Sequence, residues 1–189
     1  MDRLMDATRQ KIVSVFGSSR PAEGSDEYGL AYEVGKQLAR AGFAVCNGGY
    51  SGAMAASAKG AHDAGGETIG VTAHIFPKPA NRWIKKELRM QRFEDRLFKL
   101  VELGDAYVVL KGGTGTLLEL AYVWETMNKG FLTQKPIVVV GGFWDQVIET
   151  LRAELIWEGI GDCTKLIVQA PTPEQAASFI LKSLAPTSA

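Results

Sequence analysis

The sequence has few of the residues from which metal centres and thiol-based sites are built. Its 189 residues include two cysteines, Cys46 and Cys163, and two histidines, His62 and His74. These four residues form no motif with metal-ligand spacing, so we expect no metal site and no cysteine–histidine catalytic pair. We interpret both cysteines as reduced, small apolar side chains.

Long apolar runs and an excess of one charge are also missing. No stretch approaches the roughly 20 apolar residues of a membrane-spanning helix, and the N-terminal MDRLMDATRQ lacks the apolar core of a signal peptide. Lysine plus arginine and aspartate plus glutamate number 21 each, which leaves no basic field to attract nucleic acid or a membrane surface. The sequence therefore predicts a cytoplasmic protein with a small-molecule partner.

Short apolar runs alternate with helical patterns along the whole chain. This alternation predicts an α/β fold, a doubly wound parallel sheet of the Rossmann-like nucleotide-binding kind. With 46% hydrophobic residues and no linker, residues 1–189 are expected to form one domain. We expect strands near 12–16, 43–46, 68–71, 106–110, 136–140 and 166–168. Helices are expected near 26–42, 53–64, 83–103, 116–129 and 144–157, and from a capping box at 172–175.

Two segments between these elements leave alternatives open. Residues 72–82 contain two prolines and no periodicity, which predicts a loop that is either a lid over a site or a plain surface connection. The helix expected over 83–103 carries a basic stripe, which is either a solvated helix face or the source of one arginine for the site. Its members are Arg89, Arg92, Arg96 and Lys99.

Glycine-rich segments follow three of the expected strands. Because the carboxyl ends of parallel strands share one edge of the sheet, these segments are expected to meet there. Glycine lets successive N–H groups approach an anion, although tight turns alone also require it. The last segment opens a helix, so we predict that it binds phosphate. The residues are Gly17, Ser18 and Ser19; Gly48 and Gly49; and Gly112, Gly113, Thr114, Gly115 and Thr116.

Two familiar nucleotide-binding motifs are absent. The chain has no Gly-Lys-Ser or Gly-Lys-Thr, which excludes the phosphate-binding loop of a simple kinase or ATPase. A dinucleotide fingerprint starting at Gly113 meets Leu118 where its third glycine belongs, which disfavours ordinary NAD binding.

Glu119 lies three residues after Thr116, in the expected first turn of the helix. One interpretation is a carboxylate that interacts with the helix dipole. The other is a catalytic carboxylate, which near a ribosyl carbon stabilises an oxocarbenium-like transition state or orients attacking water.

Taken together, these motifs resemble the Lonely Guy family of cytokinin riboside 5′-monophosphate phosphoribohydrolases, often labelled lysine decarboxylases. Nearly the whole chain takes part in the resemblance. The family pattern P-G-G-x-G-T-x-x-E corresponds to residues 111–119, with Lys111 in place of the proline, and G-G-G-x-x-G-L-M-G corresponds to residues 47–55. The family's catalytic arginine stands nine residues before an aspartate, which places it at Arg96 when counted back from Asp105.

The resemblance implies a function and a set of partners. It implies hydrolysis of the N-glycosidic bond of a purine or cytokinin nucleoside 5′-monophosphate to free base and ribose 5-phosphate. Arg96 and Glu119 would be the catalytic pair, no cofactor would be needed, and the protein would be a homodimer. Related proteins on this fold bind nucleotides or carry the molybdenum cofactor, so a non-catalytic binding or carrier protein is the alternative. A third alternative is an interaction or stress protein that retains the fold alone.

Overall fold

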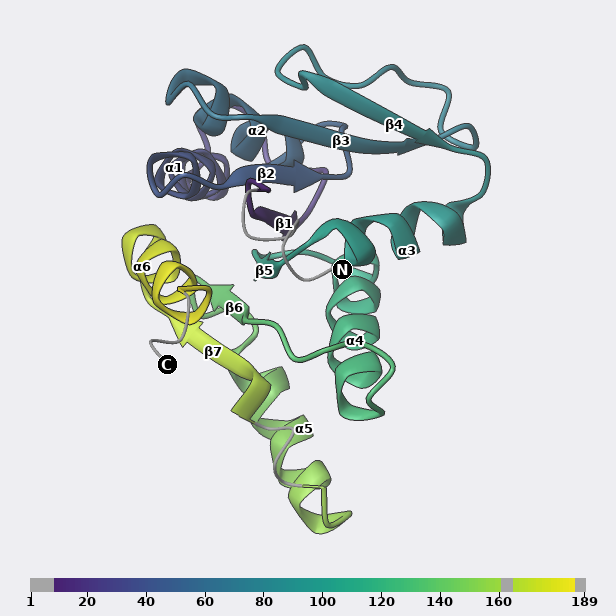
Figure 1. Ribbon diagram of the computed structural model, residues 1–189, viewed down its shortest axis with the longest axis vertical. Coiled ribbons are helices and arrows are strands. Elements are labelled where there is room, and N and C mark those ends of the chain that lie inside the picture. Colours follow the sequence, from purple (N-terminus) through teal and green to yellow (C-terminus); the bar gives the residue numbers. More distant parts are fainter. Residues whose placement is uncertain (1–8, 161–164, 186–189) are drawn as a thin grey trace.

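The computed structural model describes residues 9–160 and 165–185, so Cys163 lies outside the described part. The described residues form one seven-stranded sheet in the order β4-β3-β2-β1-β5-β6-β7, and every neighbouring pair is parallel (Figure 1). The strands are β1 (Ile12–Phe16), β2 (Ala44–Asn47), β3 (Thr68–Ala73), β4 (Lys86–Met90), β5 (Ala106–Val109), β6 (Ile137–Val140) and β7 (Ile167–Ala170). The helices are α1 (Asp26–Arg40), α2 (Ala53–Asp63), α3 (Phe93–Leu103), α4 (Thr114–Asn128), α5 (Asp145–Trp157) and α6 (Pro173–Ser183).

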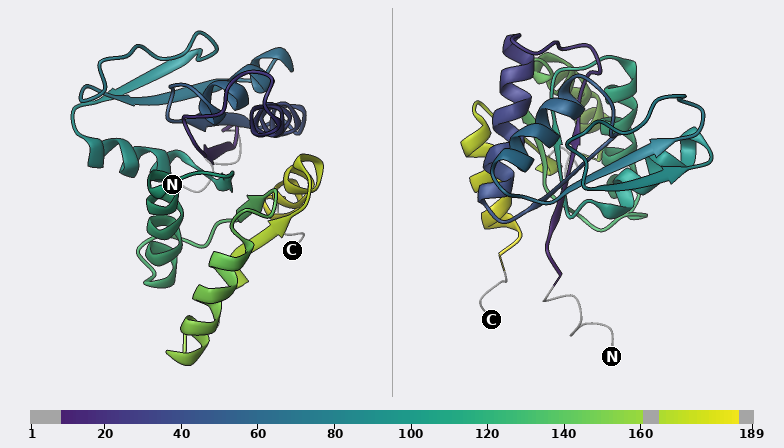
Figure 2. Two further views of the ribbon diagram at one scale, coloured as in Figure 1. Left: turned by 180° about the vertical axis from the view of Figure 1, so that it is seen from behind. Right: turned by 90° about the horizontal axis from the view of Figure 1, so that it is seen from above.

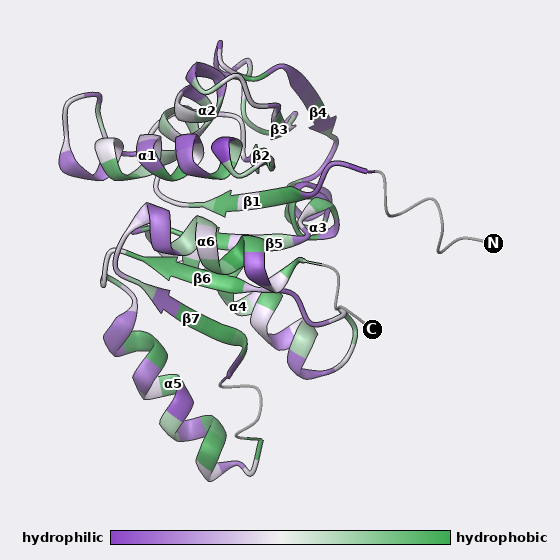
Figure 3. Cartoon of the chain, turned by 60° about the vertical axis from the view of Figure 1, so that its left-hand side comes forward, coloured by the Kyte–Doolittle hydropathy of each residue, from purple (hydrophilic) through white to green (hydrophobic). Residues whose placement is uncertain are grey.

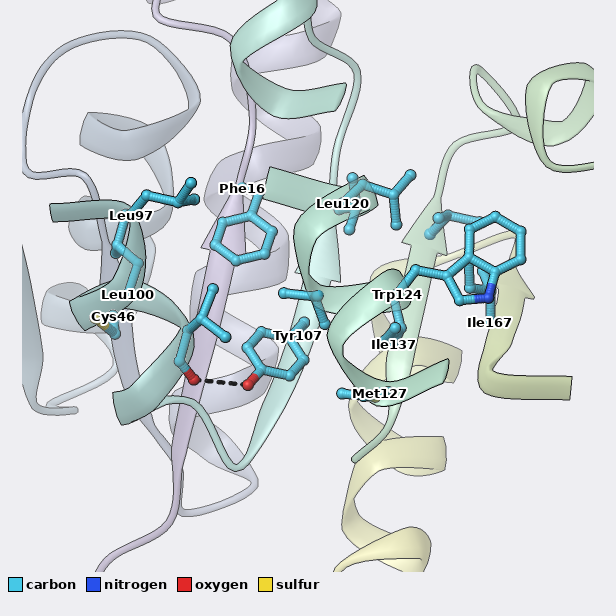
Figure 4. Close-up of a cluster of buried hydrophobic side chains, with 14 of the residues drawn as sticks. Phe16, Cys46, Leu97, Leu100, Tyr107, Leu120, Trp124, Met127, Ile137 and Ile167 are labelled. Atoms are coloured by element: carbon cyan, nitrogen blue, oxygen red, sulfur yellow. Dashed lines mark hydrogen bonds between the residues drawn. The ribbon is translucent and has the colours of Figure 1, made fainter. Parts of the chain in front are cut away.

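Helices cover both faces of the sheet, as predicted for a doubly wound fold (Figure 2). The alternation of side chains along β1 shows the two layers, because Val13 and Val15 pack with α1 and α2 while Phe16 packs with α3 and α4. On the side of the sheet covered by α3 and α4, Phe16 stacks on Tyr107, whose hydroxyl donates to the Val101 carbonyl at 2.7 Å (Figure 4). None of the described helices has the length and apolarity needed to cross a membrane.

The central strands are buried on both faces and the edge strand β4 is not. Figure 3 shows β1, β5 and β6 in hydrophobic colours and β4 mainly in hydrophilic ones. This contrast follows from position, because an edge strand keeps one side in contact with water.

The expected helix over 83–103 is wrong in its first half. Residues 86–90 form β4, and the helix begins only at Phe93. Leu88 and Met90 alternate with charged residues, which is a strand pattern. The prediction extended the helix over this strand because the apolar residues that follow have helical spacing. The basic stripe is therefore not one helix face: Arg89 lies on the strand, Arg92 precedes α3, and Arg96 is buried.

The segment between β3 and β4 is a long connection without a helix, as the loop predicted over 72–82 indicated. Its start is later than expected, because β3 continues to Ala73. Asn81 fixes the connection: its backbone N–H donates to the Gly49 carbonyl at 2.7 Å and its side-chain amide donates to the Tyr50 carbonyl at 2.9 Å. The connection is thereby held against the segment that follows β2.

Helices α1 and α2 approach closely because each has a glycine at the contact. A Cβ added at Gly35 of α1 would overlap the backbone carbonyl of Ser57, and one added at Gly60 of α2 would overlap that of Tyr32. Backbone atoms cannot turn aside as a flexible side chain can, so this contact excludes any larger residue.

We expect Gly35→Ala to lower the free energy of unfolding by about 1 to 3 kcal/mol, because the added methyl pushes the two helices apart. Gly29→Ala, on the same helix with open space around the site, serves as control. It should raise stability by about 0.5 to 1 kcal/mol through helix propensity. Urea unfolding of both variants tests this, and equal effects of the two changes would contradict the contact.

Candidate functional site

A crevice opens where the direction of the sheet order reverses. The chain runs from β1 outward to β4, then returns to place β5 on the other side of β1. Loops after β1 and β5 therefore diverge, and a cavity of about 640 Å³ lies between them. Most of the predicted site residues line it: Gly17, Ser18, Ser19, Arg96, Gly113, Thr114, Gly115, Thr116 and Glu119.

Three predicted binding residues do not line this cavity. Gly48 and Gly49 are buried behind it, and Gly112 borders a smaller neighbouring cavity. A Cβ at Gly48 would overlap the Arg96 guanidinium, and one at Gly112 would overlap the Thr116 side chain. Gly49 has a positive φ of 77°. These glycines are needed for close packing and turn geometry, and their contact with a ligand stays a prediction.

The amino terminus of α4 faces the crevice without a cap. Gly113 is its N-cap residue, no side chain accepts a hydrogen bond from its first turn, and that turn contains no acidic residue. By contrast, α1 has the Ser25 hydroxyl as a cap and two acidic residues in its first turn. Open space surrounds both Gly113 and Gly115. Exposed N–H groups and a positive dipole end make this turn suited to an anion.

The second helix at the crevice, α2, also begins uncapped. Gly52, with φ 68°, is its N-cap residue and makes no side-chain capping bond, and the first turn has no acidic residue. The backbone N–H of Ala53 donates to the Ser18 carbonyl at 2.8 Å, which fixes the loop after β1 against this helix. Ser18 and Ser19 are thus held near both helix ends.

Arg96 is buried and held by backbone carbonyls. Its side chain comes from the first turns of α3 and is 8% exposed. Nε donates to the Val71 carbonyl at 2.8 Å, and Nη2 donates to the Gly48 carbonyl at 3.2 Å. Nη2 also contacts the Met54 sulfur at 3.9 Å, so both N–H groups of Nη1 are left, and the side chain still lines the crevice. The pKa of Arg96 is lowered by burial, but guanidinium remains charged in proteins.

Glu119 lies one turn inside α4 and faces the same crevice. Burial raises the pKa of its carboxyl to about 7, although the charge of Arg96 acts in the opposite direction. The two side chains form no ion pair within 4.0 Å among the described contacts. A carboxyl with this pKa exists in both protonation states at neutral pH, which is a property of acid–base groups in active sites.

Other chemistries have little support in the described ranges 9–160 and 165–185. No three histidine, cysteine, aspartate or glutamate side chains there lie close enough to hold a metal ion. Cys46 is buried, and burial raises its thiol pKa to about 12, so it carries no nucleophilic thiolate at neutral pH.

The sequence predictions missed one wall of the crevice. Tyr50, Met54 and Phe76 line it, from the segment after β2, from α2 and from the connection after β3. The second glycine-rich segment was expected at the same edge of the sheet, and Tyr50 immediately follows its two glycines, so the sequence contained an indirect indication of Tyr50. The lid alternative for residues 72–82, which the sequence left open beside a plain surface connection, was the corresponding signal for Phe76. Neither pattern indicated that aromatic rings from the two segments would meet.

Known proteins have sequences related to this chain. Residues 54–180 match the family model described as possible lysine decarboxylase. The chain is 32% identical over 134 residues to the cytokinin riboside 5′-monophosphate phosphoribohydrolase of Rhodococcoides fascians, covering 69% of this chain and 67% of that protein. It is also 32% identical over 145 residues to the protein of the same name in Mycobacterium tuberculosis, covering 74% and 75%.

Solved structures share the fold. The molybdenum cofactor carrier protein of Chlamydomonas reinhardtii superposes with a TM-score of 0.71 at 25% identity, covering 94% of this chain and 100% of that one. The molybdenum cofactor binding protein of Rippkaea orientalis gives a TM-score of 0.73 at 21% identity, covering 93% and 98%. The extent of the family match and the identity to the curated relatives agree with the motifs, and the chain therefore belongs to the possible lysine decarboxylase family, the Lonely Guy family.

Proposed function

We propose that this protein is a phosphoribohydrolase, which cleaves the N-glycosidic bond of a purine or cytokinin nucleoside 5′-monophosphate to free base and ribose 5-phosphate. The observation that carries the proposal is Glu119. It is a carboxyl with a pKa raised to about 7, one helical turn beyond an uncapped helix terminus and in the same crevice as a buried arginine. Relatives named for this reaction support the assignment.

In the proposal the 5′-phosphate binds at the first turn of α4. The N–H groups of residues 113–116 and the hydroxyls of Thr114 and Ser18 supply donors, and the helix dipole favours the negative charge. Arg20 and Lys78 add positive charge at the exposed side of the crevice. Fixing the phosphate one turn away from Glu119 brings the sugar to that carboxyl.

The reaction then needs water, a base for its proton and stabilisation of a cationic sugar. The bond between C1′ and the base nitrogen breaks, its electron pair leaves with the base, and a water oxygen bonds to C1′. Ionised Glu119 stabilises the oxocarbenium-like charge on the sugar and accepts the proton of that water. Protonated Glu119 then returns this proton, through water, to the nitrogen of the departing base, which gives free base and ribose 5-phosphate and restores the carboxylate. The remaining N–H groups of Arg96 orient the carboxylate or a ribose hydroxyl. No step requires a metal or an organic cofactor.

A non-catalytic carrier is the second candidate. Its support is the fold shared with the molybdenum cofactor carrier of Chlamydomonas reinhardtii. The uncapped α4 terminus suits any phosphorylated ligand, whereas a carboxyl with a raised pKa in the same crevice as a buried arginine is typical of sites that transfer protons. The geometry of this chain therefore favours the enzyme.

Assembly and location belong to the same proposal. We propose a cytoplasmic homodimer, as the family resemblance implies. Large apolar side chains at the surface supply area for an interface, among them Ile156 at 62% and Trp157 at 80% exposure near the end of α5.

We expect the purified protein to release free base from AMP and from isopentenyladenosine monophosphate. Glu119→Gln should lower kcat/KM at least about 100-fold, because the amide can neither accept the water proton nor balance a cationic sugar. Chromatographic measurement of the released base tests this.

Glu125→Gln is the matched control, because it neutralises an exposed carboxyl on the same helix that contacts Asn128 and Lys129 instead of the crevice. It should retain full activity. Binding of both nucleotides without release of base would exclude the hydrolase and favour the carrier.

The rate should also depend on pH through Glu119. Because the reactive form is the carboxylate and its pKa is about 7, kcat/KM should fall about tenfold for each pH unit below that value. A pH profile of AMP hydrolysis between pH 5 and 9 measures the position of this decline. A profile that stays level down to pH 5 would rule out Glu119 as the base.

The same carboxyl should reduce stability. Below its ordinary pKa of 4.5 the folded and unfolded states are both protonated, so Glu119 has no cost there. As pH rises to about 7 the unfolded chain ionises first, and the cost grows to a constant value above that pH. Glu119→Gln should therefore stabilise the protein by about 1 to 3 kcal/mol at pH 8 and hardly at all near pH 4.5.

Denaturant unfolding at both pH values measures the difference, with Glu125→Gln again as control. Equal stability of the Glu119→Gln variant and the native protein at pH 8 would contradict the burial effect. The expected gain also separates loss of activity from loss of folding, since the inactive variant is the more stable one.

A further inference from the structure

A second cavity of about 400 Å³ adjoins the crevice at the carboxyl ends of β1, β5 and β6. Its lining comes from the loop after β1 and the start of α1, from Lys111 and Gly112, and from Phe143 after β6. We call this cavity the outer pocket. Ser18 and Arg20 line both the outer pocket and the crevice, so the two cavities are neighbours. Its size lies in the range of sites that hold small ligands.

The uncapped end of α4 lies at the boundary between the two cavities. Gly112 lines the outer pocket, whereas Gly113, the N-cap residue, lines the crevice. An anion at this helix end therefore has the crevice with Glu119 on one side and the outer pocket on the other. The Ser18 hydroxyl accepts a hydrogen bond from the Arg20 backbone N–H at 3.1 Å, so its own O–H can donate to a ligand.

Hydrogen bonds hold the walls of the outer pocket together. The backbone N–H of Ser18 donates to the Lys111 carbonyl at 3.1 Å, which joins the loop after β1 to the segment after β5. The indole Nε1 of the buried Trp144 donates to the Leu110 carbonyl at 2.9 Å, which joins the segment after β6 to the same place. Phe143 packs edge to face on Trp144, with ring centroids 5.1 Å apart. The pocket is thus formed before a ligand binds.

Lys111 brings a positive charge into the outer pocket. Its Nζ lies 2.7 Å from Oε1 of Glu27 and 5.8 Å from the centroid of the Phe143 ring. Glu27 accepts one of the three ammonium N–H groups. The two side chains are 53% and 41% exposed, and an ion pair this exposed contributes little, so a multiply charged anion can displace the carboxylate. The family pattern has proline at this position, so the charge distinguishes this chain.

The charges at the outer pocket favour an anion that is attached to the 5′-phosphate. Arg20 and Lys111 against Glu27 leave one positive charge among the residues that line it. A phosphate at the first turn of α4 carries one ester oxygen toward the sugar at Glu119. An oxygen on the opposite side of the phosphorus faces the outer pocket and can bridge to a second phosphate there.

We propose that the outer pocket binds the β-phosphate of a nucleoside 5′-diphosphate, with Lys111 and Arg20 as its partners and the α-phosphate at the first turn of α4. The inference rests on the position of the 5′-phosphate in the proposed function and requires no hydrolysis. Both partners donate charge-assisted hydrogen bonds, which are stronger than neutral ones. The protein therefore binds a nucleoside diphosphate more tightly than the corresponding monophosphate.

The test measures the dissociation constants of AMP and ADP by titration calorimetry of the full chain without divalent cations. We expect ADP to bind about tenfold more tightly than AMP, because its β-phosphate gains charge-assisted hydrogen bonds. Lys111→Met should remove most of this difference and leave the affinity for AMP within about twofold. Lys111→Arg keeps the charge and should keep the difference.

Lys129→Met is the matched control, because it removes an exposed lysine at the other end of α4, where Lys129 pairs with Glu125. It should leave both dissociation constants unchanged. Equal affinities for AMP and ADP, or a difference that survives Lys111→Met, would overturn the assignment of the outer pocket. So would inorganic phosphate that raises the affinity for AMP to that for ADP, since the pocket would then take a free anion.

The outcomes separate this inference from the proposed function. Tighter binding of ADP that depends on Lys111, with no release of base from AMP, would uphold the outer pocket and refute the hydrolase. Release of base from AMP together with equal affinities for AMP and ADP would uphold the hydrolase and refute the outer pocket.

Discussion

The candidate site depends on one buried cation. The Arg96 guanidinium can lie inside the protein because the carbonyls of Val71 and Gly48 accept hydrogen bonds from it and two aromatic rings lie beside it. Removing an ion from water is costly unless such partners compensate. Gly48 helps to accommodate the charge in two ways: its carbonyl accepts a hydrogen bond from the guanidinium, and it has no side chain at the place where the guanidinium lies. The charge then acts on Glu119, whose own burial works against ionisation.

Much of the fold follows from local sequence patterns. The strands before each glycine-rich segment are mainly apolar, and the helices α1 and α6 begin at the capping residues Ser25 and Thr172. Strand β4 could not be recognised in the same way, because it is largely exposed and directly followed by a helix with strong periodicity. Its place is set by pairing with β3, which is a long-range contact.

The sequence predicted those parts of the site in which binding of an anion requires a particular backbone conformation. It was less informative about the parts whose position depends on side-chain packing between distant segments. Residues 113–116 and Glu119 follow from a glycine turn that opens a helix, and both lie in the crevice. Gly48 and Gly112 also lie in glycine-rich segments that follow strands. In the structure, however, the lack of a side chain at these two glycines leaves room for the side chains of Arg96 and Thr116, which the sequence pattern alone does not indicate. Arg96 was indicated by family spacing, whereas its carbonyl partners on β3 and after β2 come from distant parts of the chain.

The connection between β3 and β4 has no helix and bonds to the sheet only near its two ends, through His74 and through Trp83 and Lys85, yet it supplies Phe76 to the crevice. Its attachment through Asn81 is to the backbone of Gly49 and Tyr50, which any neighbouring sequence can provide. Insertions or replacements in this segment can therefore reshape the pocket while Arg96 and Glu119 remain on their helices. The segment that supplies Phe76 and the helices that carry Arg96 and Glu119 are separate stretches of the chain, so evolution can alter the shape of the pocket without displacing this pair.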